Sequence, residues 1–283
     1  MPLSDLEVLR AAQPGLWALA AGLIGLCVGS FLNVCAHRLP KGESVVTPGS
    51  RCACGKPIPA WLNLPLLGWL FLRGRARCCG APLSLRYPLL ELAGGAALAL
   101  AWYVLPADRA LAASVMLPIL LLLAACDIES LLVPDAPNFL LVLSGLAFSA
   151  ALPSLHAIPP YSLPLAEHIM SLSESLLGVA VGTAITWWAR IIGTAFAGQE
   201  AMGEADIILC AGLGAFGGWQ GALFTFFGGA VLGLILVLPS LIIARIRGTP
   251  RPATLPFVPA LALAGAIWFF SGPEILDFWL GRA

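Results

Sequence analysis

Long runs of apolar residues alternate with short polar segments along the whole chain. The longest run without a charged residue covers 38 residues, from Ile207 to Ala244. A helix needs about 20 residues to cross the hydrocarbon of a bilayer, so this run predicts two spans, separated at the turn-forming sequence Gly217-Gly218-Trp219-Gln220-Gly221. The runs lack the period-2 alternation of a membrane β-barrel, so helices are the predicted spanning elements.

The apolar runs predict an all-α polytopic membrane protein with about eight transmembrane helices. Their ranges are 15–36, 87–106, 110–127, 136–153, 175–193, 206–217, 221–244 and 254–272. The sixth is short, which predicts a tilted or partly buried helix. The first is expected to remain as a span, because its positive charges follow it and no cleavage pattern stands out. We therefore expect three parts: a first span (1–36), a loop domain (37–86) and a seven-span domain (87–283).

Charge adds an orientation to this picture. Only 11% of the residues are charged and the net charge is zero, yet twelve of the fifteen Lys and Arg residues fall in alternate loops. This bias predicts that those loops face the cytosol and that both termini lie outside. Because topology explains the basic charge, we expect the lipid bilayer as a partner and no nucleic acid. The twelve cations are Arg38, Lys41, Arg51, Lys56, Arg73, Arg75, Arg77, Arg86, Arg190, Arg245, Arg247 and Arg251.

The loop between the first two predicted spans is the one sizeable polar segment of the sequence. It is too small to bury much core without a staple, and it contains Cys52, Cys54, Cys78 and Cys79. Thiols in a reducing cytosol seldom form disulfides, whereas two such pairs can hold a structural zinc ion in a zinc-ribbon-like domain. The CxC and CC spacings differ from the usual CxxC, so four reduced thiols in a small hydrophobic knot are the alternative.

Two aspartates, Asp127 and Asp206, lie where an apolar run meets a polar loop, both on the predicted cytosolic side. Burying a carboxylate beside lipid costs several kcal/mol unless it is paired or hydrated. Two carboxyl groups within hydrogen-bond reach share a proton, so the anion can activate water while the acid polarises a carbonyl. Each aspartate alone also fits a helix cap, above all Asp206 at a predicted helix N-terminus.

A series of short motifs runs in order through nearly the whole chain. They are Gly29-Ser30-Phe31-Leu32-Asn33-Val34, Arg38-Leu39-Pro40, Asn63-Leu64-Pro65, Leu72-Arg73-Gly74, Arg86-Tyr87-Pro88 with Glu91, Asp127 with Leu132-Val133-Pro134-Asp135, and the turn from Glu200 to Asp206. Together they resemble the prepilin peptidases, which are membrane aspartyl proteases of type IV pilus and type II secretion systems.

The resemblance implies an eight-span fold, a cytosolic zinc-binding loop and catalytic aspartates at Asp127 and Asp206. It also implies that pilin and pseudopilin precursors are cut after a Gly at the end of a basic leader. The new N-terminus would then be methylated from S-adenosylmethionine, at residues that the motifs leave unknown. The implied location is the bacterial inner membrane, with periplasmic termini and a cytosolic catalytic face.

Two departures from the family pattern keep other readings open. The usual GxGD turn reads Gly203-Glu204-Ala205-Asp206, and Ala76 stands where the second cysteine pair would begin. A non-catalytic assembly subunit would keep the fold with an altered turn at Ala205. A transporter would use intramembrane carboxylates for cations or protons, although it predicts acids near the midplane and an internal repeat, neither of which the sequence shows.

Overall fold

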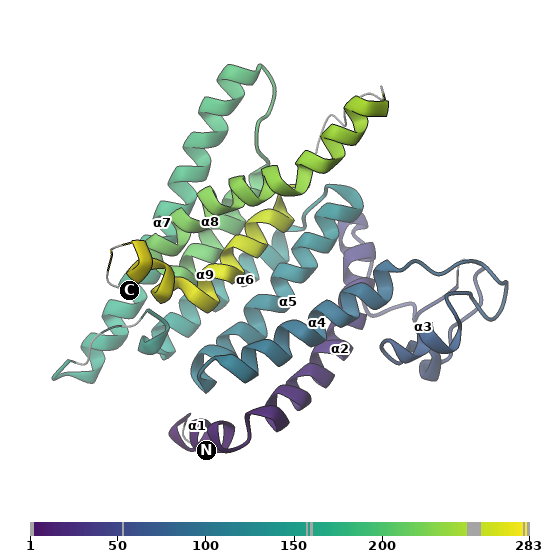
Figure 1. Cartoon of the computed structure of the whole chain (residues 1–283), viewed down its shortest axis with the longest axis horizontal. Coiled ribbons are helices and arrows are strands. Elements are labelled where there is room, and N and C mark those ends of the chain that lie inside the picture. Colours follow the sequence, from purple (N-terminus) through teal and green to yellow (C-terminus); the bar gives the residue numbers. More distant parts are fainter. Residues whose placement is uncertain are drawn as a thin grey trace. The chain divides into compact units, whose positions relative to one another are not determined.

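Figure 1 shows the computed structural model of the chain, which describes residues 3–52, 54–156, 158, 161–247, 256–279 and 281. Within these residues the chain is nearly all helical, with two isolated β-bridges and no longer strand. In this described part of the chain, six helices are long and apolar enough to cross a membrane. The predicted all-α membrane class is therefore confirmed, while the count of eight spans stays a prediction.

Two compact units divide the chain, Met1–Leu132 and Val133–Ala283. The first unit contains α1 (Leu3–Ala12), α2 (Pro14–Arg38), η1 (Leu39–Lys41), η2 (Ala60–Asn63), α3 (Leu67–Phe71), α4 (Arg86–Val104) and α5 (Ala107–Ser130). The second contains α6 (Asp135–Ala151), η3 (Pro153–His156), α7 (Pro164–Ala197), α8 (Glu204–Arg247) and α9 (Val258–Trp279). The predicted domain limits at residues 36 and 86 stay predictions.

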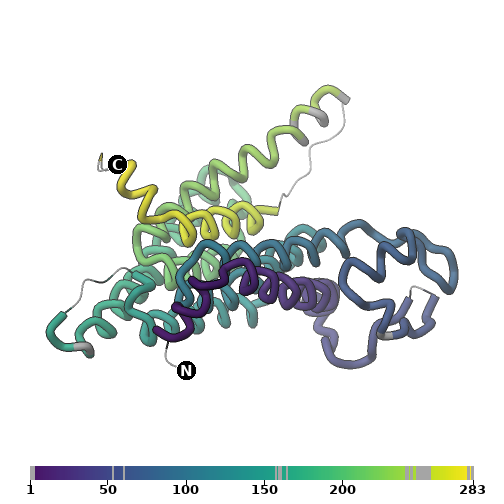
Figure 2. The backbone as a smooth tube through the Cα atoms, turned by 60° about the horizontal axis from the view of Figure 1, so that its bottom comes forward, coloured from purple at the N-terminus to yellow at the C-terminus, as the bar shows by residue number. Residues whose placement is uncertain are grey.

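Helices α2 and α4 run side by side in the first unit, as both views show (Figures 1 and 2). Their backbones lie close together at Gly25, where an added Cβ would overlap the carbonyl oxygen of Gly94. Small residues permit such approach in a membrane, where dispersion contacts rather than the hydrophobic effect hold helices together. Helix α5 packs on the end of α2, since buried Leu122 and Cys126 belong to the same apolar cluster as Leu32.

Helix α8 of the second unit is broken at Gly218, whose φ of 67° and ψ of −172° lie outside the helical range. This break falls inside the predicted turn at 217–221. The contacts of α8 with α9 show that the chain reverses at this break. Before the break, Leu213 lies against Gly265 and Gly217 lies against Trp268, so the contacts move toward the C-terminal end of α9. After the break, Gly221 lies against Trp268 and Gly229 lies against Leu261, so the contacts move back toward its N-terminal end. The two predicted spans 206–217 and 221–244 thus correspond to two antiparallel segments.

The last predicted span, 254–272, is only partly covered by the described residues. Residues 254 and 255, like Arg251, lie outside them, and α9 begins at Val258. Trp268 donates a hydrogen bond from its indole Nε1 to the carbonyl oxygen of Gly217 at 3.0 Å. This bond supplies a partner to a carbonyl at the break in α8, which is needed because hydrocarbon offers none.

The contact between α2 and α4 gives a stability prediction. The change Gly25→Ala should lower the free energy of unfolding by about 1–3 kcal/mol, because the added methyl forces two backbones apart. Thermal unfolding in detergent, followed by circular dichroism, measures the loss. The matched control is Gly15→Ala at the exposed start of α2, where a Cβ meets no atom within 4 Å. Equal melting temperatures for the two variants would contradict the close packing.

Candidate active site and metal centre

Asp127 lies in the last turn of α5 and only 6% of its surface is exposed. The sequence predicted that this helix ends at Asp127, but the structure continues it to Ser130. Asp127 is therefore not a terminal cap. An anion is disfavoured near a helix C-terminus, where the backbone carbonyls carry partial negative charge. Helix stability consequently offers no reason for this buried carboxyl group.

A charged network surrounds the same end of the first unit. The Glu129 carboxylate accepts a hydrogen bond from His37 Nδ1 at 2.8 Å and forms an ion pair with Arg86. Lys41 Nζ lies 2.9 Å from His37 Nε2. These contacts join the end of α2 to the start of α4 and the end of α5. The negative charge of Glu129, two residues from Asp127, is thus balanced by cations.

Asp206 is the third residue of α8 and only 7% of its surface is exposed. Its Oδ2 accepts a hydrogen bond from the backbone N–H of Gly203 at 3.1 Å. A carboxylate at this position bonding back to the N–H before the helix is one half of a capping box. The capping role considered from the sequence is therefore realised at Asp206, and it also fixes the carboxylate in one orientation.

The turn before Asp206 is held by the end of α7. The Arg190 guanidinium donates to Glu200 at 3.0 Å and to Glu204 at 3.1 Å. The N–H of Ala201 donates to Thr194 Oγ1 at 3.2 Å. The sequence identified Arg190 only as a topological charge and gave no role to Thr194. Their roles depend on contacts between α7 and the turn, which spacing along the chain does not show.

Ala205, which replaces the second glycine of the family-like turn, has an ordinary backbone conformation. It lies inside α8 and is not among the described residues with positive φ. Its carbonyl oxygen accepts a hydrogen bond from Nδ2 of the buried Asn138 on α6 at 3.4 Å. A methyl group is compatible with this geometry, because only a left-handed conformation would require glycine here.

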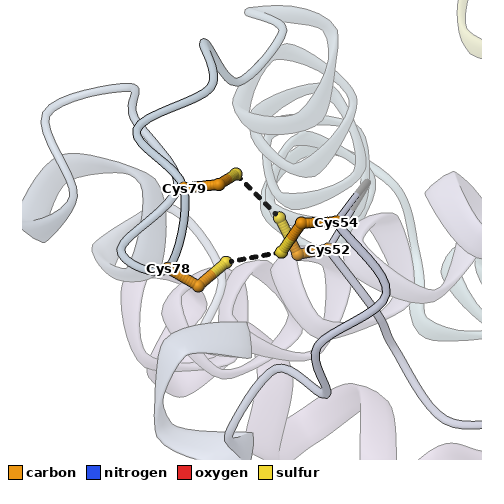
Figure 3. Close-up of side chains that lie close together, drawn as sticks. All are labelled: Cys52, Cys54, Cys78 and Cys79. Carbon is orange, nitrogen blue, oxygen red and sulfur yellow. Dashed lines mark hydrogen bonds between the residues drawn. The ribbon is translucent and has the colours of Figure 1, made fainter.

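Four cysteines of the polar loop gather at one point, with their sulfur atoms all within 4.8 Å of one another. Figure 3 shows Cys52 and Cys54 on one turn facing Cys78 and Cys79 on another. The Sγ atoms of Cys52 and Cys79 are 3.6 Å apart, and those of Cys54 and Cys78 are 3.3 Å apart. Zinc–sulfur bonds of about 2.3 Å in a tetrahedron place sulfurs about 3.8 Å apart, so this donor set fits zinc.

Two similar turns hold these cysteines despite their unusual spacing. An antiparallel bridge closes the first turn between Arg51 and Pro57, and another closes the second between Arg75 and Pro82. Gly55 and Gly80 follow the last cysteine of each turn with φ of 84° and 69°. The buried Ala76 occupies the place where a CxxC turn would carry its first cysteine. Cys78, which directly precedes Cys79, supplies the sulfur atom of this pair instead.

Hydrogen bonding within the cluster separates the pKa values of its thiols. The backbone of Cys54 and the thiol of Cys78 lower the pKa of Cys52 to about 7. The pKa of Cys78 is raised to about 12, chiefly by its hydrogen bond to Cys52. The Cys52 thiolate therefore forms readily at neutral pH, whereas the Cys78 thiol keeps its proton unless a cation replaces it. Metal affinity should accordingly rise with pH.

Two buried polar residues of the first unit received no role from the sequence, although both occur in the family-like motifs. The Glu91 carboxylate on α4 accepts a hydrogen bond from the N–H of Leu66 at 2.7 Å, where Leu66 has a φ of 59°. Asn33 on α2 donates from Nδ2 to the carbonyl oxygen of Tyr87 at 3.2 Å. Glu91 thus ties the start of α3 to the helix pair. Each is a polar residue inside an apolar run, and this feature of the sequence could have identified both as structurally important.

Two family models match successive parts of the chain. The family model for the bacterial peptidase A24 N-terminal domain matches residues 23–105, which include the four clustered cysteines. The model for the type IV leader peptidase family matches residues 114–238, which include Asp127 and Asp206. No solved structure matches the chain.

Curated relatives extend over most of the chain. A protein from Klebsiella pneumoniae is 40% identical over 76% of this chain and 91% of its own length. One from Aeromonas hydrophila is 33% identical over 96% and 97%, respectively, and one from Pseudomonas putida is 33% identical over 94% of both. Each is named prepilin leader peptidase/N-methyltransferase.

The helical fold and these matches define a membrane peptidase. The chain belongs to the type IV leader peptidase family. Together with the six long apolar helices among the described residues, this membership indicates a multi-pass protein of the inner membrane. The transporter alternative loses its basis.

The sulfur cluster gives a metal prediction. Protein purified without chelators should contain about one zinc ion per chain by elemental mass spectrometry, because one tetrahedral site takes four thiolates. The changes Cys54→Ser and Cys78→Ser should remove most of it, and strong acidification should release it because protons compete with the metal for the thiolates. The control Cys27→Ser, an exposed cysteine on α2, should keep the metal. Equal zinc in all variants would contradict the site.

Proposed function

We propose that this protein removes the basic leader of type IV pilin-like precursors by cutting after a Gly, with Asp127 and Asp206 as an aspartate dyad. The observation that carries the proposal is the burial of both carboxyl groups, at 6% and 7% exposure, on apolar helices within residues 114–238. Prepilin leader peptidase is also part of the names of the relatives. The two aspartates belong to separate units, and their pairing is part of the proposal.

The proposed chemistry needs no metal in the peptidase step. In a dyad, one carboxyl group keeps a proton because two adjacent anions repel each other in a poorly hydrated site. The ionised carboxylate accepts a proton from water as the water oxygen attacks the scissile carbonyl. The protonated partner donates a hydrogen bond to the carbonyl oxygen, and a proton then passes to the leaving amine. The hydrogen bond from Gly203 would keep the Asp206 carboxylate oriented during these transfers.

We further propose that the new N-terminal amine is methylated and that S-adenosylmethionine supplies the methyl group. The support is the second half of the relatives' names, N-methyltransferase. We assign no residue of this chain to the methyl donor. In the loop, Cys52, Cys54, Cys78 and Cys79 would hold a structural zinc ion, which would staple the two bridged turns together.

The proposed orientation has both termini in the periplasm and the catalytic face in the cytosol. It rests on the distribution of the Lys and Arg residues in alternate loops. Acidic residues on this face would steer a cationic leader if their charges were unbalanced. The structure limits that idea, because Glu129 is paired with Arg86 and His37. Glu200 and Glu204 share the single cation Arg190, so this pair of carboxylates retains about one net negative charge.

A non-catalytic assembly subunit is the remaining alternative, and it depended on Ala205. Because Ala205 lies within a regular helix, its methyl group gives no physical reason for lost activity.

The aspartates can be tested by isosteric replacement. Asp127→Asn and Asp206→Asn should each reduce cleavage of a co-expressed prepilin by about 10²- to 10⁴-fold, because an amide can neither take the proton nor donate it in the same way. Intact-mass measurement of the pilin N-terminus reports both leader removal and the added methyl group. Asp135→Asn, at the exposed start of α6, is the control and should process normally. Retained cleavage by Asp206→Asn would exclude the dyad.

The turn gives a separate prediction. Ala205→Gly should change the cleavage rate by less than about threefold, since the methyl group stands in a helical conformation and the carbonyl bond to Asn138 is kept. Initial rates on the same prepilin substrate measure the effect. A large gain of activity on restoring the glycine would instead support the non-catalytic alternative for the natural chain.

A further inference from the structure

The second unit carries a surface groove beside the turn that leads to Asp206. Its volume is about 430 Å³. It lies on a face of α7 near its C-terminal end, and Glu200 of the following turn also lines it. The lining residues are Trp187, Arg190, Ile191, Thr194, Ala195 and Glu200. We call this feature the α7 groove.

The α7 groove is built from the same residues that hold the turn. Arg190 donates to Glu200 and Glu204, and Thr194 accepts a hydrogen bond from the N–H of Ala201. The turn then reaches Asp206, whose carboxylate is fixed by Gly203. A chain lying in the groove would therefore lie next to the segment that orients one of the proposed catalytic carboxyl groups.

The lining of the groove has an apolar stripe and a polar stripe side by side on α7. Trp187, Ile191 and Ala195 offer apolar surface on a membrane-spanning helix. Beside this stripe, Arg190 faces the exposed carboxylates of Glu200 and Glu204 in and after the turn, which leaves about one net negative charge. An apolar helix preceded by a basic segment would complement both features of the groove. The helix would pack on Trp187 and Ile191, and a Lys or Arg of the basic segment would pair with the carboxylates of Glu200 and Glu204.

We propose that the α7 groove is the docking site for the apolar helix of the prepilin substrate, with its basic leader against Glu200 and Glu204. The inference rests on the proposed function and names a substrate subsite for it. Docking here would present the junction between leader and helix to the turn before Asp206. Trp187 and Ile191 would then determine substrate affinity, and Glu200 would determine the preference for a basic leader.

Neighbouring side chains on α7 provide matched controls. Trp188 and Ile192 are 61% and 51% exposed, and Trp187 and Ile191 are 51% and 46% exposed. The first pair does not line the groove. General contact with lipid would involve both pairs alike, whereas a docked helix would contact Trp187 and Ile191 specifically. Because all four are exposed, truncation to Ala removes little packing within the chain.

The first experiment compares cleavage kinetics of the full-length chain in lipid nanodiscs. Trp187→Ala and Ile191→Ala should each weaken processing of a prepilin on the order of tenfold, mostly through a higher KM, because a docking contact is lost. Trp188→Ala and Ile192→Ala should match the natural chain. Glu200→Gln should weaken processing of a basic leader more than that of a leader with its Lys and Arg replaced, and added salt should reduce this difference. Equal kinetics for both pairs of variants would overturn the docking site.

The second experiment measures binding without turnover. In an Asp206→Asn background, the photocrosslinking residue benzoylphenylalanine is placed at position 187 or at position 188, and the prepilin is added in nanodiscs. Crosslinks to the prepilin should predominate at 187. Equal yields at both positions, or crosslinks at 187 to lipid alone, would overturn the proposal. If crosslinks predominate at 187 but the natural chain cleaves no prepilin, the docking site stands and the proposed function fails.

Discussion

Hydrocarbon supplies no hydrogen-bond partner, and this constraint governs where the chain places its polar groups. The break at Gly218 illustrates it. Helical bonding is interrupted there, and the carbonyl oxygen of Ala215 is satisfied instead by hydroxyl groups of Ser149 and Ser175, at 3.2 and 2.8 Å. Trp268 does the same for Gly217. A reversal inside the second unit is thus possible only because three other helices bring donors to it.

The same constraint explains the arrangement around the candidate catalytic groups. Asp206 receives the N–H of Gly203, and Asn138 reaches the carbonyl oxygen of Ala205. Arg190 then anchors the turn from outside. With these contacts, the turn holds its geometry without the second glycine of the family pattern. In the first unit, the network centred on Glu129 keeps the ends of three helices together next to Asp127.

Much of the fold follows from hydropathy because helices in lipid need long apolar runs. The first span was predicted at 15–36 and is found at Pro14–Arg38, and the break was predicted at 217–221 and is found at Gly218. The ends of the helices were predicted less accurately, since α5 continues to Ser130, about one turn beyond its predicted end at Asp127. For the polar loop, the sequence identified the important residues but not the fold that positions them. Its four cysteines were identified, but the bridged turns that bring them together depend on contacts absent from the spacing.

The sequence by itself determined the membrane class, the apolar segments, and the candidate groups Asp127, Asp206 and the four cysteines. It could do so because the energetic cost of charge beside lipid and the thiol chemistry of zinc depend on residue type and local position. Only the tertiary structure decided that Ala205 is helical, that Arg190 clamps the turn and that Glu129 is neutralised. Those properties depend on which residues of different helices meet, and hydropathy along one chain does not specify such meetings.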